Sequence, residues 1–251
     1  MQTEASPAEP TEVAFFVTCL VNTLRPDAGF AAIRLLEAAG FNVAVPRAQT
    51  CCGQPNYNNG DPAHAANGAR AVIEAFSPWQ QVVVPSASCA GMIRNHYPRL
   101  LADDPIWLPR ARALAEKTRE LAEFLAPVAH RLPSNPDFTG RLTHHHSCSA
   151  LREIGVTQPV EALLSHCLPN ADVRELQEPE ACCGFGGTFC VKFHAVSGKM
   201  GQNKLADIRS TGAATTTSLD LGCQLHLQSL QTQGDIELIH LAELLVREAC
   251  P

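Results

Sequence analysis

Eight of the eleven cysteines form two copies of one pattern. In each copy a single cysteine precedes an adjacent pair that is followed by glycine, and one more cysteine comes after the pair. The intervals are 32 and 37 residues in the first copy and 34 and 40 in the second, so an internal duplication explains them better than chance does. The first copy consists of Cys19, Cys51, Cys52 and Cys89, and the second of Cys148, Cys182, Cys183 and Cys223.

Four gathered thiols suit a cluster of several iron atoms. Structural zinc sites usually use C-x2–4-C spacing, and two adjacent cysteines cannot easily reach the same tetrahedral ion. An iron–sulfur cluster contains several iron atoms, so adjacent cysteines can bond different iron atoms. Such clusters also take thiolates in sets of four. Gly53 and Gly184, directly after the pairs, would let the backbone turn tightly against the inorganic core. The pattern predicts a cluster, with buried structural thiols or thiol–disulfide exchange as alternatives; the chain has no C-x-x-C redox motif.

Other candidate side chains are expected to be structural. Cys167 lies in an apolar helical run and is predicted to be a core thiol, Cys190 is predicted to pack, and Cys250 is expected to be an exposed thiol. The histidines at 144–146 follow a strand pattern, in which at most two could face one site. We expect them to be ordinary core or surface histidines rather than hydrogen-bond donors to cluster sulfur.

Motifs for other chemistry are absent from the sequence. The glycines at 184–187 do not complete G-x-G-x-x-G, because Phe189 stands at the last glycine position. No P-loop, G-x-S-x-G or H-E-x-x-H motif occurs. The chain therefore shows no nucleotide, nicotinamide or flavin site of its own.

Composition excludes several classes of protein. Hydrophobic residues make up 45% and charged residues 18% of the 251 residues, which is typical of a well-packed globular protein. The net charge of −6, without a run of lysine or arginine, argues against nucleic-acid binding. No apolar stretch reaches ~18 residues, so no membrane span is expected. Residues 1–10 read as a solvated tail without signal-peptide features, so we expect a cytoplasmic protein whose thiols stay reduced.

The elements that must position these cysteines alternate between strand and helix. We expect an α/β fold of two tandem, similar Rossmann-like domains with small parallel sheets, at 12–130 and 141–251, joined by a proline-containing linker at 131–140. The cysteine-bearing loops should lie at the carboxyl ends of the strands, near the domain interface. Strands are predicted at 13–18, 41–45, 81–84, 141–145, 172–176 and 213–217, and helices at 28–39, 63–76, 111–125, 158–165, 194–209, 220–231 and 237–248.

Four sequence stretches resemble the CCG cysteine-rich domain proteins. They are TCCG at 50–53, VPSASC at 84–89, SCSALREIG at 147–155 and ACCGFGGTFCVK at 181–192. This family includes the heterodisulfide reductase B subunit, the glycolate oxidase iron–sulfur subunit and the lactate utilisation A group, which the chain resembles most. The resemblance implies a cytoplasmic iron–sulfur protein that transfers electrons and acts with two companion proteins, one of them iron–sulfur, to oxidise L-lactate to pyruvate.

The resemblance also implies the ligands. One or two [4Fe–4S] clusters would be held by the eight cysteines of the two copies. The fullest family pattern ends each half with C-x-x-C, which supplies a fifth cysteine, but Ser86 and Asp220 stand at those positions here. The alternatives are a subunit of a related 2-hydroxy acid or heterodisulfide-type oxidoreductase, or a non-catalytic zinc or structural scaffold of such a complex.

Overall fold

Two four-stranded parallel sheets form the framework of the protein. The computed structural model describes residues 11–232 and 234–250, so the expected tail at 1–10 lies outside the described residues. The sheets have the same strand order, β2-β1-β3-β4 and β6-β5-β7-β8, with every neighbouring pair parallel. The strands are β1 Glu12–Phe15, β2 Asn42–Ala44, β3 Val82–Val84, β4 Thr118–Glu120, β5 Arg141–His144, β6 Asp172–Arg174, β7 Thr215–Ser218 and β8 Glu237–His240. This repeated topology confirms the predicted α/β class with two similar units.

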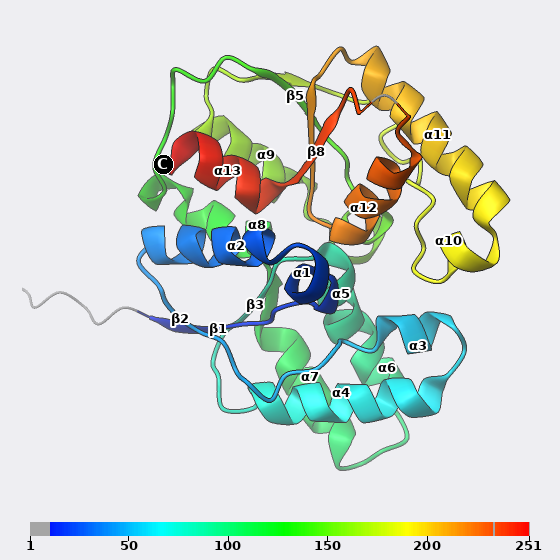
Figure 1. Cartoon of the computed structure of the whole chain (residues 1–251). Helices are drawn as coiled ribbons and strands as arrows, with labels where there is room; N and C mark the ends of the chain where they lie inside the picture. Colours follow the sequence, from blue (N-terminus) through cyan, green and yellow to red (C-terminus); the bar gives the residue numbers. More distant parts are fainter. Residues whose placement is uncertain (1–10, 233, 251) are drawn as a thin grey trace, which may run out of the picture.

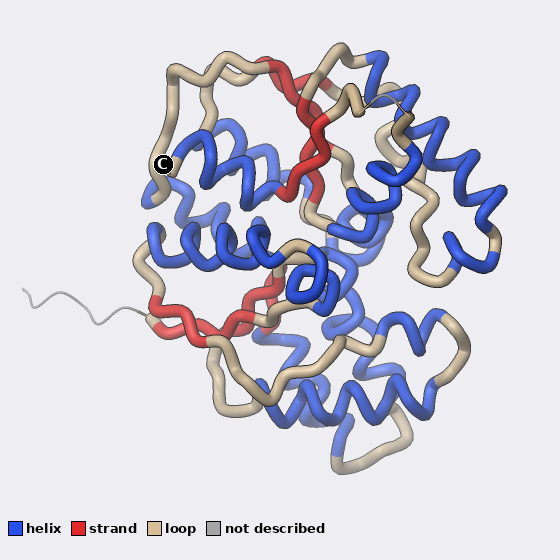
Figure 2. The backbone as a smooth tube through the Cα atoms, viewed as in Figure 1, coloured by secondary structure: helices blue, strands red, loops and turns tan. Residues whose placement is uncertain are grey.

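Helices fill the connections between the strands (Figure 2). In the first half these are α1 Cys19–Leu24, α2 Pro26–Ala38, α3 Gln54–Asn58, α4 Pro62–Phe76, α5 Ala87–Gly91, α6 Tyr97–Leu100, α7 Trp107–Lys117 and α8 Leu121–Leu125, with a π-helical turn at Met92–His96 and a 3-10 turn at Ala126–Arg131. In the second half they are α9 Thr157–Cys167, α10 Phe189–Lys192, α11 His194–Ser210, α12 Leu221–Leu230 and α13 Leu241–Ala249, with a π-helical turn at Ala150–Ile154. Across the described part of the chain, every helix falls short of the length and apolar character that a membrane span requires.

The expected helix over 111–125 is wrong, because a strand interrupts it. Residues 118–120 form β4 and pair with β3, and a new helix begins at Leu121. Glu120 caps this helix: its side-chain oxygen Oε2 accepts hydrogen bonds from the backbone N–H groups of Ala122 and Glu123. A strand of three residues without an apolar run carries too little sequence signal, so pairing with β3 decides its conformation.

The same error recurs at the equivalent place in the second half. The expected helix over 237–248 is divided into β8 and α13, and His240 is the residue between them. Its Nδ1 accepts a hydrogen bond from the backbone N–H of Ala242, and Glu243 completes a capping box. Leu238 and Ile239 of the strand run directly into apolar helix residues, which masked the boundary in the sequence.

One apolar core extends through both halves. It joins buried side chains of α2, α8, α9 and α13, including Leu35, Leu125, Leu163 and Leu245. Figure 1 shows these four helices side by side between the two sheets. Residues 132–140 hold neither helix nor strand and connect the halves; the domain division at 131–140 stays a prediction.

Candidate metal centre

The first four patterned cysteines meet at the carboxyl edge of the first sheet. Cys19 opens α1 directly after β1, Cys51 and Cys52 lie in the loop after β2, and Cys89 lies in α5 after β3. The Sγ atoms of Cys19 and Cys51 are 3.6 Å apart, and those of Cys52 and Cys89 are 3.3 Å apart. Parallel strands that end at one edge bring these distant residues together, as their spacing predicted.

The second four cysteines repeat this arrangement. Cys148 follows β5, the pair at 182–183 lies in the loop after β6, and Cys223 lies in α12 after β7. The Sγ atoms of Cys183 and Cys223 are 2.9 Å apart, and the thiols of Cys148 and Cys182 lie near enough to shift each other's pKa. In both sets the second cysteine of the pair and the last cysteine are the buried ones. We call the two sets the first quartet and the second quartet.

Both quartets open onto one cavity. Its volume is about 450 Å³, and every quartet cysteine except Cys51 lines it. Loops and helix starts from both halves form its wall, and among the described residues no lysine or arginine lines it. The expectation that the cysteine-bearing edges lie near each other is therefore confirmed.

Crowding of the thiols governs their pKa values. Hydrogen bonds from the thiols of Cys19 and Cys52 lower the pKa of Cys51 to about 2. The hydrogen bond to Cys51, together with burial, raises the pKa of Cys19, and the hydrogen bonds to Cys51 and Cys89 with burial raise that of Cys52. Without a cation, ionisation of one thiol therefore opposes ionisation of its neighbours. A bound metal removes this conflict, because coordinating thiols lose their protons.

The second quartet shows the same pattern. Hydrogen bonds from Cys148 and Cys183 lower the pKa of Cys182 to about 2. The hydrogen bond to Cys182, followed by burial, raises the pKa of Cys148. The first cysteine of each pair is thus the acidic thiol of its quartet.

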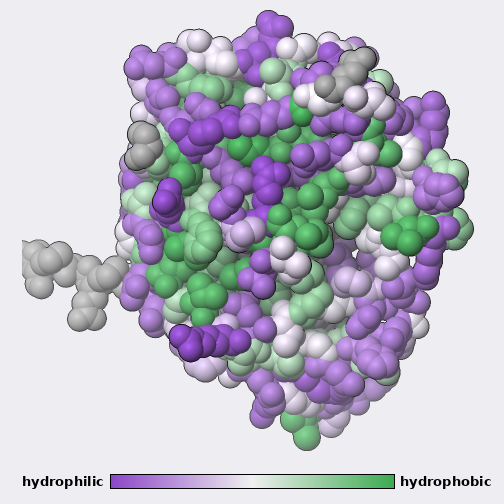
Figure 3. Space-filling view, viewed as in Figure 1, coloured by the Kyte–Doolittle hydropathy of each residue, from purple (hydrophilic) through white to green (hydrophobic). Residues whose placement is uncertain are grey.

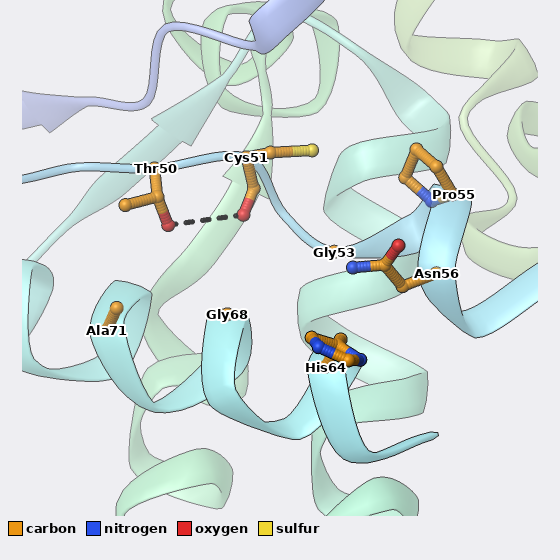
Figure 4. Close-up of a pocket in the computed structure, with 8 residues that line it drawn as sticks. All are labelled: Thr50, Cys51, Gly53, Pro55, Asn56, His64, Gly68 and Ala71. Atoms are coloured by element: carbon orange, nitrogen blue, oxygen red, sulfur yellow. Dashed lines mark hydrogen bonds between the residues drawn. The ribbon is translucent and has the colours of Figure 1, made fainter. Parts of the chain in front are cut away.

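Glycine lets each cysteine pair lie against the following helix. Gly53 has φ +81°, and a Cβ there would lie 3.3 Å from the carbonyl oxygen of Ala65 in α4. A second pocket, lined among others by Cys51, Gly53 and Gly68, lies between this loop and α4. Figure 4 shows that the Cys51 carbonyl oxygen points toward α4 at Gly68, whereas the Cys51 sulfur points away from this pocket. In the second half Gly184 has φ +90°, and a Cβ would lie 2.5 Å from the Ser197 carbonyl oxygen in α11. Glycine is therefore required sterically at the second pair and by conformation at both.

Ser86 and Asp220, one from each half, are joined by a hydrogen bond. The Ser86 hydroxyl donates to Asp220 Oδ1 at 2.7 Å, and both residues are buried. Oδ1 also accepts the backbone N–H of Ser88 at 3.0 Å and its hydroxyl at 2.7 Å, while Oδ2 accepts the hydroxyl of Ser147. The hydrogen bonds from Ser86 and Ser88 join the two halves, and the one from Ser147 lies within the second half.

His145 has surroundings that the sequence did not predict. It is 1% exposed, and neither ring nitrogen has a hydrogen-bond partner among the described residues. One of its nitrogens and the sulfurs of Cys183 and Cys223 all lie within 4.8 Å of one another. Burial lowers the pKa of His145 to about 4, so the imidazole is neutral at pH 7. His144, in contrast, bonds Thr217 Oγ1 through Nδ1 at 2.6 Å, as a core histidine does.

The three cysteines outside the quartets have other environments. Cys167 is buried in the shared core, as predicted, and burial raises its pKa to about 12. Cys190 is partly buried in α10, and its thiol lies 3.0 Å from the Gly187 carbonyl oxygen. Cys250 was expected to be exposed, but it is partly buried and packs against the core because α13 carries it there.

Apolar side chains are exposed beside the cavity. Val191, Phe193 and Val196 are 77%, 57% and 56% exposed, and Val191 also lines the cavity. Figure 3 shows apolar surface over α10 on this side of the molecule.

Fold and site together define a duplicated α/β protein with one cysteine quartet at the edge of each sheet. The family model described as "CCG: Cysteine-rich domain" matches residues 13–94 and 142–228. The chain belongs to this family of cysteine-rich domain proteins. The two matched segments contain the two quartets.

Curated relatives cover nearly the whole chain. The chain is 39% identical over 236 residues to Lactate utilization protein A of Bacillus pumilus, covering 93% of this chain and 98% of that protein. It is also 39% identical to Lactate utilization protein A of Halalkalibacterium halodurans, covering 93% and 96%. The expected resemblance to this group is confirmed.

A solved structure shares the fold. A hypothetical protein from Helicobacter pylori superposes with a TM-score of 0.70 at 11% identity and covers 98% of this chain. The chain spans about half of that protein, since the match covers 51% of it.

Proposed function

We propose that the protein is an iron–sulfur electron carrier in a system that oxidises L-lactate to pyruvate. The observation that carries the proposal is the gathering of two matching cysteine quartets at the edge of one cavity. Two sets of four thiols fit the ligand count of [4Fe–4S] clusters, one for each half.

The first quartet does not have the compact shape of a site for one tetrahedral ion. Thiolates on one tetrahedral zinc ion all lie about 3.8 Å from one another, as follows from zinc–sulfur bonds of about 2.3 Å. Among the described residues, only His145, Cys183 and Cys223 form a trio of donor atoms within 4.8 Å of one another. The first quartet is instead a row of neighbouring sulfurs from Cys19 to Cys89.

The residues of this chain would hold and tune such a cluster. The eight quartet cysteines would ligate iron, which supplies one-electron chemistry when bound. Backbone N–H groups already face the second quartet: those of Gly184 and Phe185 donate to the sulfurs of Cys182 and Cys183 at 3.3 and 3.5 Å. Hydrogen bonds to sulfur and burial are the means by which a protein sets a cluster's potential.

The substrate and the partners in this proposal rest on similarity. The relatives are named for lactate utilisation, and we infer that this chain serves the same process together with two companion proteins, one of them iron–sulfur. A cytoplasmic location suits eleven free cysteines, because cytoplasmic reductants keep thiols reduced. We infer that the protein acts through its clusters.

A zinc-holding scaffold is the second candidate. The compact trio of His145, Cys183 and Cys223 has the nitrogen and sulfur donors that zinc accepts. This candidate predicts stoichiometric zinc and a protein that does not change its redox state.

Anaerobic purification of the full chain distinguishes the two candidates. The electron carrier should be brown, contain iron and acid-labile sulfide, and show broad absorbance near ~400 nm that bleaches with dithionite, as expected of iron–sulfur clusters. Colourless protein with one or two zinc ions and no sulfide would overturn the proposal. Genes for the companion proteins beside this one would support lactate over the related 2-hydroxy acid and heterodisulfide systems.

A further inference from the structure

Phe16 and His145 occupy equivalent positions in the two halves. Each lies three residues before the first cysteine of its quartet. The backbone N–H of Phe16 donates to the Val83 carbonyl at 2.9 Å, and that of His145 donates to the Thr217 carbonyl at 2.8 Å. Val83 and Thr217 in turn lie six residues before the last cysteine of their quartets. The duplication therefore places a phenyl ring and an imidazole at one and the same point of the fold.

The two rings have different surroundings. Phe16 is fully buried and belongs to the apolar cluster that contains Cys52 and Cys89. Its ring centroid lies 5.4 Å from that of Phe76, with the two rings tilted. His145 is also buried, but both of its ring nitrogens lack hydrogen-bond partners among the described residues. Polar groups buried in this way are rare in folded proteins because leaving them unpaired is costly, and they often mark a place where an ion or a water molecule binds.

We propose that His145 is a nitrogen ligand of the metal centre held by the second quartet. Its imidazole already lies within 4.8 Å of the sulfurs of Cys183 and Cys223, and imidazole is an established ligand of iron in proteins. The first quartet has no such donor at the equivalent place, since Phe16 stands there. The inference rests on the proposed function and makes the two centres chemically different.

The difference has a redox consequence. A histidine that takes the place of a thiolate raises the reduction potential of an iron–sulfur centre, because imidazole is neutral and thiolate is negative. With His145 bound in place of one quartet thiolate, the second centre should have the higher potential of the two. The two centres would then differ in reduction potential, although the two halves share one topology.

Pulsed electron paramagnetic resonance tests the ligand directly. Full-length protein produced with ¹⁵N-histidine, loaded anaerobically with iron and sulfide and reduced with dithionite, should show the hyperfine coupling of an iron-bound nitrogen. His145→Phe, which installs the residue of the first half, should lose this coupling. His146→Phe, at the half-buried neighbour, is the matched control and should keep it.

Cysteine variants show which of the two centres carries the nitrogen coupling, even if His145→Phe fails to fold. Cys52→Ser should keep the nitrogen coupling, and Cys183→Ser should lose it. A Mössbauer spectrum of the ⁵⁷Fe-loaded wild type provides a second readout, with one iron site distinct from the thiolate-bound sites. Two loaded centres without nitrogen coupling would overturn this inference and leave the proposed function standing, whereas protein that binds no iron would overturn both.

Discussion

The hydroxyl of Ser86 donates a hydrogen bond of 2.7 Å to the carboxylate of Asp220, 134 residues away in the other half of the chain. At these two positions the sequence has serine and aspartate, where the resemblance implies a fifth cysteine in the fullest pattern. The carboxylate accepts three further hydrogen bonds, two from Ser88 and one from Ser147. Ser86 and Asp220 thereby form a polar contact that joins the halves, with both quartets beside it.

Removal of the Asp220 carboxylate should weaken the contact between the two halves. Asp220→Ala leaves buried hydroxyls without their charged acceptor and should lower the free energy of unfolding by about 3 kcal/mol. Urea denaturation of the metal-free chain measures the effect. Asp235→Ala, which breaks a half-exposed ion pair with Arg209, is the control and should cost less than about 1 kcal/mol. Equal losses in the two variants would contradict the special role of Asp220.

The glycine after the second cysteine pair should tolerate no side chain. Gly184→Ala places a Cβ 2.5 Å from a backbone oxygen of α11 at φ +90°, so the loop must move. We expect a destabilisation of about 2–4 kcal/mol, with iron lost from the second centre alone. Gly198→Ala, in the interior of α11 with open space around it, should instead be neutral or stabilise by up to about 1 kcal/mol. Unchanged iron content in Gly184→Ala would show that the tight turn is dispensable.

A buried glutamate should make stability depend on pH. Burial raises the pKa of Glu120 from 4.5 to about 8, and Oε1 has no partner among the described residues. Between these two values the folded protein keeps a proton that the unfolded chain has released, so stability falls as pH rises. Glu120→Gln cannot ionise and keeps an oxygen for the Ala122 N–H. Its stability relative to wild type should therefore increase, by on the order of 3 kcal/mol between about pH 5 and pH 9.

Chemical denaturation at several pH values measures this difference. Glu116→Gln, at an exposed position of the preceding helix, is the control and should follow the wild type. A parallel response of Glu120→Gln and wild type would show that Glu120 is ionised in the folded state.

The cysteine spacing predicted the gathering of each quartet, because the carboxyl ends of parallel strands must converge at one edge. The fourth strand of each sheet was missed because β4 and β8 are short and end at the cap of a helix. The contact between Ser86 and Asp220 depends on how the halves pack, which local patterns do not determine. His145 did carry a signal: superposing the two copies on their cysteines sets it against Phe16, a polar residue against an apolar one.

Iron content of single-cysteine variants tests the central claim most directly. Cys52→Ser and Cys183→Ser each remove one buried thiol, from the first and the second quartet respectively. If each quartet holds its own cluster, each variant should retain about half of the wild-type iron and acid-labile sulfide, because cluster ligation takes four thiolates, and the double variant should retain none. Cys167→Ala, at a buried cysteine outside the quartets, should retain all of it. Loss of all the iron from either single variant, or no loss from both, would contradict two independent cysteine centres.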